Sequence, residues 1–112
     1  MNTVFHLSTD DPEKVSELLG NIKNLKKDET IKVNEIAAVL NADGVKAALK
    51  ASEAAEYLQP LMEDSLTLKV CSNSINGRKI SEEELLEDLE IVSSGVGELN
   101  RLQDEGFNYI KI

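Results

Sequence analysis

The chain has 112 residues, and we expect residues 1–112 to fold as a single domain. Hydrophobic residues make up 41% of the sequence and aromatic residues only 4%, which is typical of a folded protein with an aliphatic core. Acidic residues outnumber basic ones by 21 to 12, so the net charge of −9 argues against nucleic acid or an anionic membrane surface as a partner.

The sequence also indicates the cellular compartment. No stretch approaches the roughly 20 consecutive apolar residues of a membrane span, and the N-terminus lacks the basic region and long apolar run of a secretory signal. The only cysteine, Cys71, cannot form an internal disulfide. These features predict a cytoplasmic protein, with no membrane partner, in which Cys71 is a free thiol.

The first third of the chain alternates between strand and helix. Residues Val4–Leu7 are apolar and β-prone, which predicts a first strand. Asp10–Glu13 predicts the start of a helix, because it offers an Asp cap, a proline at the first helical position and an acid near the positive helix end. Ile31–Leu40 contains a second strand, and the continuous apolar run in its second half is typical of a central parallel strand.

The middle of the chain is predicted to contain two helices and a strand. We expect a loop at Asn41–Gly44 and a short helix at Val45–Leu49. Another helix follows Ser52, and Pro60 falls inside it, which predicts a break or a kink. Leu66–Cys71 is the third predicted strand.

The last third returns to the same alternation. Ser72–Lys79 is predicted to be a polar turn region, and a capping box beginning at Ser81 predicts a short helix through Leu86. Leu89–Val92 is the fourth predicted strand, and Ser93–Gly97 turns the chain into the last helix.

The chain ends with a helix stop and a strand. Gly106 is predicted to end the last helix in the left-handed conformation, and Phe107–Ile112 is the fifth predicted strand. The alternation as a whole predicts an α/β fold, with a five-stranded parallel sheet between two layers of helices.

In an open parallel sheet, ligands and reactive groups gather outside the carboxyl ends of the strands. The loops after the first four strands should therefore share one edge of this sheet. They are Ser8–Asp11, Asn41–Gly44, Cys71–Asn76 and Ser93–Gly97.

Cys71 is the candidate catalytic residue at this edge. A thiolate is the reactive form of cysteine, and the backbone N–H groups of the following turn would favour it. Ser72, Asn73 and Ser74 supply such groups together with polar side chains, and Arg78 adds a positive charge nearby. The alternative is that Cys71 is a small buried hydrophobe at a strand end, as free cysteines usually are.

His6 is the only histidine and lies near the end of the first strand. It is a candidate acid or base, but the alternation of side chains along a strand also allows it to pack beneath a helix. With one His and one Cys, no zinc-type cluster exists, and the acidic runs are explained by helix capping, so we expect neither a metal nor a cofactor.

The glycine-rich segment after the fourth strand is a candidate anion-binding loop. Its place between a strand and a helix suits an anion, but it lacks the lysine of a P-loop and the third glycine of a dinucleotide fingerprint. The alternative is a tight turn that needs glycine. The residues of the candidate anion or ligand loop are Asn41, Gly44, Ser93, Ser94, Gly95 and Gly97.

Several segments resemble the DsrE/DsrF-like (YchN-like) sulfur-relay family, especially its small stand-alone members. Val70–Ser74 and Ile80–Leu86 resemble the family's cysteine segment, and Ser93–Leu99, continuing through Gly106 and Tyr109–Lys111, resembles its C-terminal signature. The resemblance implies a three-layer α/β/α fold and assembly into homotrimers, hexamers or hetero-oligomers. It also implies a role for Cys71, because sulfur-relay members carry sulfur as a persulfide on a cysteine at this position.

Three functions follow as hypotheses. The first is an intracellular sulfur carrier or sulfurtransferase that holds a persulfide on Cys71 and exchanges it with donor and acceptor proteins. The second is a non-catalytic oligomeric module that binds a small anion or nucleotide at the strand ends. The third is a structural or regulatory subunit without chemistry of its own, so the sequence leaves open whether the protein is an enzyme.

Overall fold

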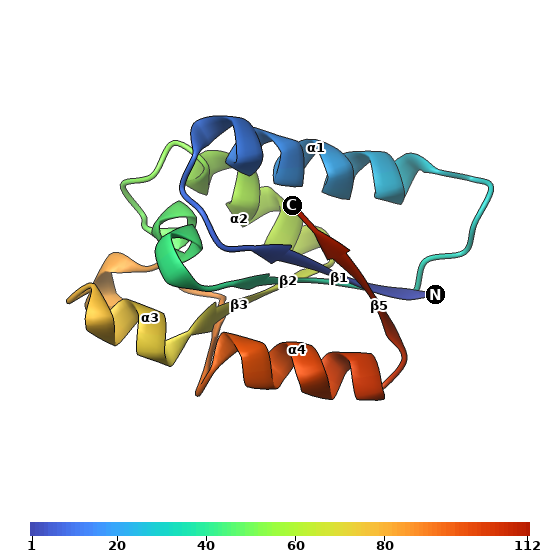
Figure 1. The fold of residues 1–112 in the computed structure, drawn as a ribbon. Helices are drawn as coiled ribbons and strands as arrows, with labels where there is room; N and C mark the ends of the chain where they lie inside the picture. The colour runs from blue at the N-terminus through green and yellow to red at the C-terminus, as the bar shows by residue number, and fades with distance from the viewer.

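A computed structural model describes residues 1–112 and shows a five-stranded, all-parallel sheet (Figure 1). The strand order is β4-β3-β2-β1-β5, so the chain moves outward from β1 to β4 and then returns to the opposite edge. The α/β class predicted from the alternation is therefore confirmed. The strands are β1 (Asn2–Leu7), β2 (Glu35–Leu40), β3 (Leu66–Cys71), β4 (Glu90–Val92) and β5 (Phe107–Lys111).

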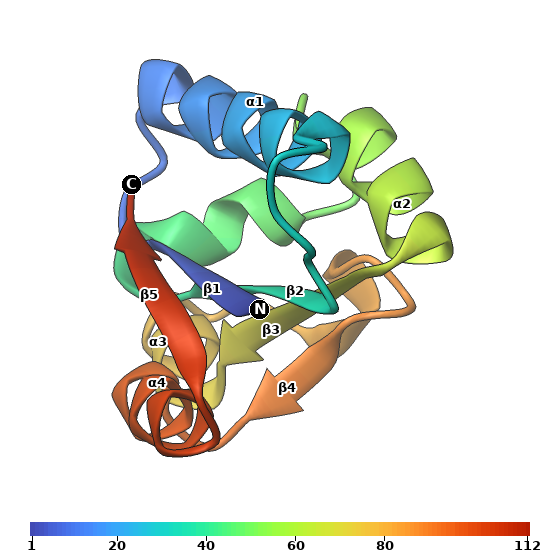
Figure 2. The same cartoon turned by 90° about the vertical axis from the view of Figure 1, so that its right-hand side faces the viewer.

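Helices cover both faces of the sheet. Figures 1 and 2 show α1 and α2 on one face and α3 and α4 on the other. None of these helices has the length and apolar composition required to cross a bilayer. The α-helices are α1 (Pro12–Lys27), α2 (Ala55–Asp64), α3 (Ser72–Gly77) and α4 (Gly95–Asp104), and the 3-10 helices are η1 (Ala42–Ala48) and η2 (Glu82–Glu84).

The start of α1 follows from local chemistry. Asp11 is the N-cap, and its Oδ1 accepts a hydrogen bond of 3.0 Å from the Glu13 backbone N–H, while Pro12 occupies the first helical position. Leu18 and Ile22, four residues apart, are both buried against the sheet. The predicted cap of this helix is confirmed.

Two apolar clusters hold the layers together. The larger contains 20 buried residues and includes those of α1, η1 and α2. The smaller cluster lies under α4 and contains Val4, Ala37, Val39, Leu99 and Leu102. The apolar core under α4 is therefore the smaller of the two.

Two predictions for the middle segments are wrong: the polar turn after Cys71 and a break at Pro60. Residues 72–77 form α3 and not a polar turn, because Ile75 is 3% exposed and anchors the segment to the core. The helix α2 continues through Pro60 without a break. Pro60 and Glu56 are both exposed, so water can bind the Glu56 carbonyl that loses its intrahelical donor.

One further boundary differs from the prediction. The capping box between Ser81 and Glu84 is present, but η2 ends before Leu85 instead of continuing through Leu86. Leu85 forms an antiparallel bridge with Leu49, and the Leu86 N–H donates to the Ala48 carbonyl at 3.0 Å, so buried extended pairing replaces the last helical turn.

The predicted loop at residues 41–44 is also shorter than expected, because η1 already begins at Ala42 and so includes Gly44. A Cβ atom on Gly44 would overlap the backbone carbonyl oxygen of Leu7. Glycine at this position therefore lets η1 approach the end of β1.

The substitution Gly44→Ala should destabilise the fold by about 2 kcal/mol or more, because the backbone must move to admit a methyl group. Gly20→Ala is the matched control, since a Cβ on Gly20 meets no atom within 4 Å. The control should be about 0.5–1 kcal/mol more stable than the wild type, because alanine favours a helix interior. Urea unfolding measures both variants, and equal effects of the two would contradict this account of Gly44.

Candidate functional site

The sheet register places Cys71 and His6 on the same face. His6 is paired with Val39, and Val39 with Lys69, so these side chains point the same way in a parallel sheet. Cys71 is two residues after Lys69 on β3 and therefore shares that face, which is the one covered by α4. Both candidate residues lie at the carboxyl end of their strands.

The Cys71 side chain is 5% exposed and belongs to neither apolar cluster. Burial by itself would raise the pKa of the thiol. Hydrogen bonding to the Ser74 hydroxyl and to backbone N–H groups of Gly95, Ser74 and Asn73 outweighs burial, so the pKa of Cys71 lies below its ordinary value. The environment of this cysteine is therefore polar and favours the thiolate.

A second hydrogen bond orients the Ser74 hydroxyl. The Ala42 backbone N–H donates to Ser74 Oγ at 2.8 Å, so the hydroxyl oxygen accepts there and its own proton is free for the sulfur. Ala42 has a φ of 50°, a left-handed conformation that alanine rarely adopts. The strained turn after β2 thus contributes to the environment of the thiol.

The start of α4 forms the remaining side of the site. Ser94 caps this helix by accepting a hydrogen bond of 2.9 Å from the Gly97 N–H. A Cβ on Gly95 would lie 3.0 Å from the Asn41 Cβ and 3.4 Å from the Cys71 Cβ, and a Cβ on Gly97 would lie 2.8 Å from Ser94 Oγ. Both glycines permit close approach, which is the structural alternative considered for this loop.

His6 connects two further strands to the site. Its Nε2 lies 2.8 Å from Asn41 Oδ1, and its Nδ1 lies 2.6 Å from the Tyr109 hydroxyl. Because an amide oxygen only accepts, Nε2 carries the proton, and Nδ1 accepts from Tyr109. Burial lowers the pKa of His6, and nearby Lys111 adds to this effect against the opposing Asn41 hydrogen bond, so the ring is neutral at neutral pH.

The structure brings together most, but not all, of the predicted site residues. Arg78 is directed at Asp43, with 2.9 Å between Nε and Oδ1, and it is not among the groups that lower the pKa of Cys71. The Ser72 hydroxyl lies 3.4 Å from the Asn76 amide, and Ser93 is exposed. Lys69 shares the face of Cys71 but is paired with buried Glu98 at 2.6 Å.

Sequence reasoning missed Tyr109 and Ala42. Alternation along β5 puts Tyr109 on one face, but only the strand order reveals that β5 lies beside β1 and thus beside His6. An alanine in a left-handed conformation has no sequence signal at all, because glycine and asparagine are the residues that indicate such positions.

These features define a class of protein: a parallel α/β protein with one thiol at the end of a central strand, among the loops of the neighbouring strands. The model of the DsrE/DsrF-like family matches residues 3–112. The chain therefore belongs to the DsrE/DsrF-like family, and the resemblance inferred from the sequence is confirmed. The comparison with curated proteins gives no match.

Two solved structures are similar over the whole chain. One is MTH1491 from Methanobacterium thermoautotrophicum, a protein of unknown function with 33% identity and a TM-score of 0.92, covering 99% of this chain and 98% of its own. The other is the ychN protein from E. coli, with 19% identity and a TM-score of 0.80 over 100% of both chains. The ychN structure supports the fold alone.

The contribution of Ser74 to the thiol can be measured. Ser74→Ala should raise the pKa of Cys71 and move the pH dependence of its alkylation by iodoacetamide to higher pH, because one hydrogen bond to the thiolate is lost. Ser72→Ala, on the same helix, should leave the curve in place. An unchanged curve for Ser74→Ala would show that its hydroxyl does not act on the sulfur.

The state of His6 predicts a pH dependence of stability. Because its pKa is lowered in the folded chain, the unfolded chain binds the proton more readily. The free energy of unfolding should therefore fall as the pH decreases through the ordinary histidine pKa of roughly 6.5. Urea unfolding at a series of pH values should show a weaker slope in that window for His6→Gln than for the wild type, whereas parallel slopes would refute a neutral, half-buried imidazole.

Proposed function

We propose that the protein carries sulfane sulfur as a persulfide on Cys71. What supports this most strongly is the position of a single cysteine at the carboxyl end of an interior strand, where the Ser74 hydroxyl and nearby backbone N–H groups lower the pKa of its thiol. Such an environment activates a thiol, whereas a purely structural cysteine needs only apolar packing. Membership of the DsrE/DsrF-like family agrees with sulfur relay in general terms.

The chemistry is a thiolate exchange at sulfur. The Cys71 thiolate attacks the outer sulfur of a donor persulfide, R–S–SH, forming a new S–S bond while the donor S–S bond breaks and R–S⁻ leaves. The product is Cys71–S–SH. An acceptor thiolate then attacks that outer sulfur, takes it as its own persulfide and regenerates the Cys71 thiolate, so no external oxidant or reductant is required.

The neighbouring residues have distinct roles in this proposal. The Ser74 hydroxyl and the Gly95 N–H stabilise the negative sulfur before attack and after release. Asn41 lies against Gly95 and is held by His6, which in turn accepts from Tyr109. We assign His6 and Tyr109 as positioning residues, because the two ring nitrogens of His6 are engaged by Tyr109 and Asn41.

Access to the sulfur is narrow. Cys71 is 5% exposed, which admits a small terminal sulfur more readily than a bulky reagent. Val96, in the first turn of α4 beside the site, is 61% exposed, and it offers an apolar surface for a donor or acceptor protein. The homotrimer or hexamer expected from the resemblance stays a prediction, and light scattering of the native chain measures it.

The test is the mass of the intact protein after incubation with a small-molecule persulfide. The wild type should gain one sulfur atom, and dithiothreitol should remove it. Cys71→Ser should gain none, and Ser74→Ala should gain sulfur more slowly at neutral pH because its thiolate fraction is smaller.

Two outcomes would go against the proposal. If native Cys71 reacts with iodoacetamide but never gains sulfur, the thiol is reactive and the persulfide idea is wrong. If anionic metabolites stabilise both the wild type and Cys71→Ser equally in a thermal-shift assay, while neither carries sulfur, the alternative of an anion-binding or nucleotide-binding module at the strand ends is favoured.

A further inference from the structure

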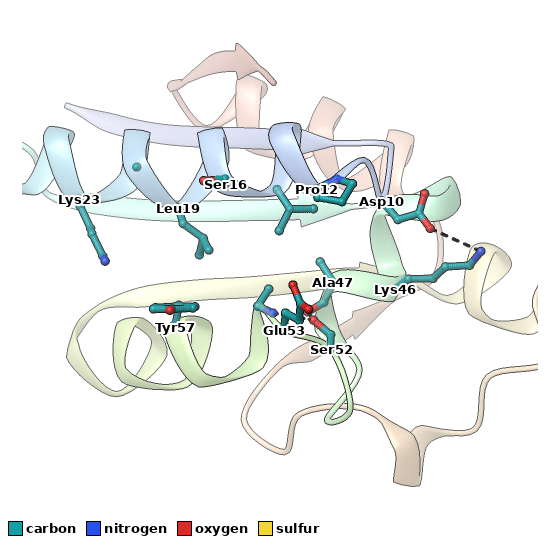
Figure 3. Close-up of a pocket in the computed structure, with 13 residues that line it drawn as sticks. Asp10, Pro12, Ser16, Leu19, Lys23, Lys46, Ala47, Ser52, Glu53 and Tyr57 are labelled. Atoms are coloured by element: carbon teal, nitrogen blue, oxygen red, sulfur yellow. Dashed lines mark hydrogen bonds and ion pairs between the residues drawn. The ribbon is translucent and has the colours of Figure 1, made fainter.

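A groove of about 550 Å³ lies on the sheet face opposite Cys71, between α1 and the segment formed by η1 and the start of α2. Its size falls within the range of small-molecule sites, roughly 300–1,000 Å³. Figure 3 shows Leu19 and Lys23 extending from α1 toward the side that carries Tyr57. Val15 and Ala47 add to the apolar walls. The sheet separates this groove from the thiol, so the two sites are independent.

Gly20 is an unusual residue for the wall of this groove. It lies in the interior of α1, where glycine is about 0.5–1 kcal/mol less favourable than alanine. A Cβ at this position would meet no atom within 4 Å, so packing against the rest of the protein does not require a glycine. The missing side chain instead widens the groove, which Gly20 lines.

The two lysines that line the groove differ in their ion pairs. Lys46, at one end, has Asp10 at 3.7 Å and Asp43 at 3.4 Å. Lys23, in contrast, forms no ion pair, and its Nζ lies 5.5 Å from the centre of the Tyr57 ring. That ring is 49% exposed and presents a flat apolar surface. An ammonium without a carboxylate thus lies beside an open aromatic ring.

We propose that this groove binds a small amphipathic monoanion, such as an aromatic or short-chain carboxylate. The carboxylate pairs with Lys23, and the apolar body lies between Leu19 and Tyr57, over the gap left by Gly20. Acidic Asp10 and Glu53 also line the groove, and they repel a second negative charge. A nucleotide or another polyphosphate is therefore a poor fit.

The probe is anilinonaphthalene sulfonate, which combines one anionic group with a flat apolar body and fluoresces when it leaves water. The full chain should bind it saturably. Lys23→Gln should weaken binding roughly two- to fivefold, the range of a surface ion pair, and Gly20→Leu should abolish it by filling the groove. Lys27→Gln, on the same helix but outside the groove, should bind as the wild type does.

A neutral analogue separates charge from apolar contact. Phenylnaphthylamine has the same ring system without the sulfonate, so Gly20→Leu should abolish its binding and Lys23→Gln should leave it unchanged. Circular dichroism confirms that each variant is folded. Absence of saturable binding by the wild type, equal binding by folded Gly20→Leu, or an equal effect of Lys23→Gln on both probes would overturn the proposal.

Discussion

The hydrogen bonds at the Cys71 sulfur depend on how closely the start of α4 approaches the ends of β2 and β3. Gly95 favours this approach, because a Cβ there would lie 3.0 Å from the Asn41 Cβ, which is closer than most such contacts. With the helix in this position, the Gly95 N–H and the groups of Ser74 act on the same sulfur. The polar environment of the thiol therefore arises from three loops that only the parallel sheet brings to one edge.

The two faces of the sheet differ in how much of the apolar core they carry. The face under α1 and α2 carries the larger apolar cluster and accounts for most of the buried core. The face under α4 has a cluster of only five buried residues, which leaves room for polar side chains such as His6 and Lys69 at the strand ends. The polar side chains around Cys71 therefore lie on the face that contributes less of the buried apolar core.

Much of the fold could be predicted from the sequence, because caps, apolar periodicity and strand patterns are local signals. The N-cap at Asp11, the strand Leu66–Cys71 and the left-handed Gly106 were all recognisable in this way. The errors occurred where tertiary contacts decide the local structure. Ile75 stabilises a helix in a segment rich in turn residues, and the pairing of Leu85 with Leu49 ends a helix early.

The position of Cys71 could be predicted from the sequence, but the residues that surround it could not. The position of Cys71 at a strand end follows from the pattern, and so does the sharing of one edge by several loops. The contact of His6 with Tyr109 depends on the strand order, and the position of Ser74 depends on the unusual backbone of Ala42. Local sequence patterns encode neither the contact of His6 nor the position of Ser74. The residues around the thiol could therefore be identified only from the structure.

The central claim is that the native fold stabilises the Cys71 thiolate. The most direct measurement is the ultraviolet absorbance of the thiolate during a pH titration of the native protein, with Cys71→Ser as the baseline and the urea-unfolded chain as the reference. Our account predicts that the native thiol ionises at lower pH than the unfolded one. Ionisation at the same or a higher pH would contradict it, because burial would then outweigh the hydrogen bonds.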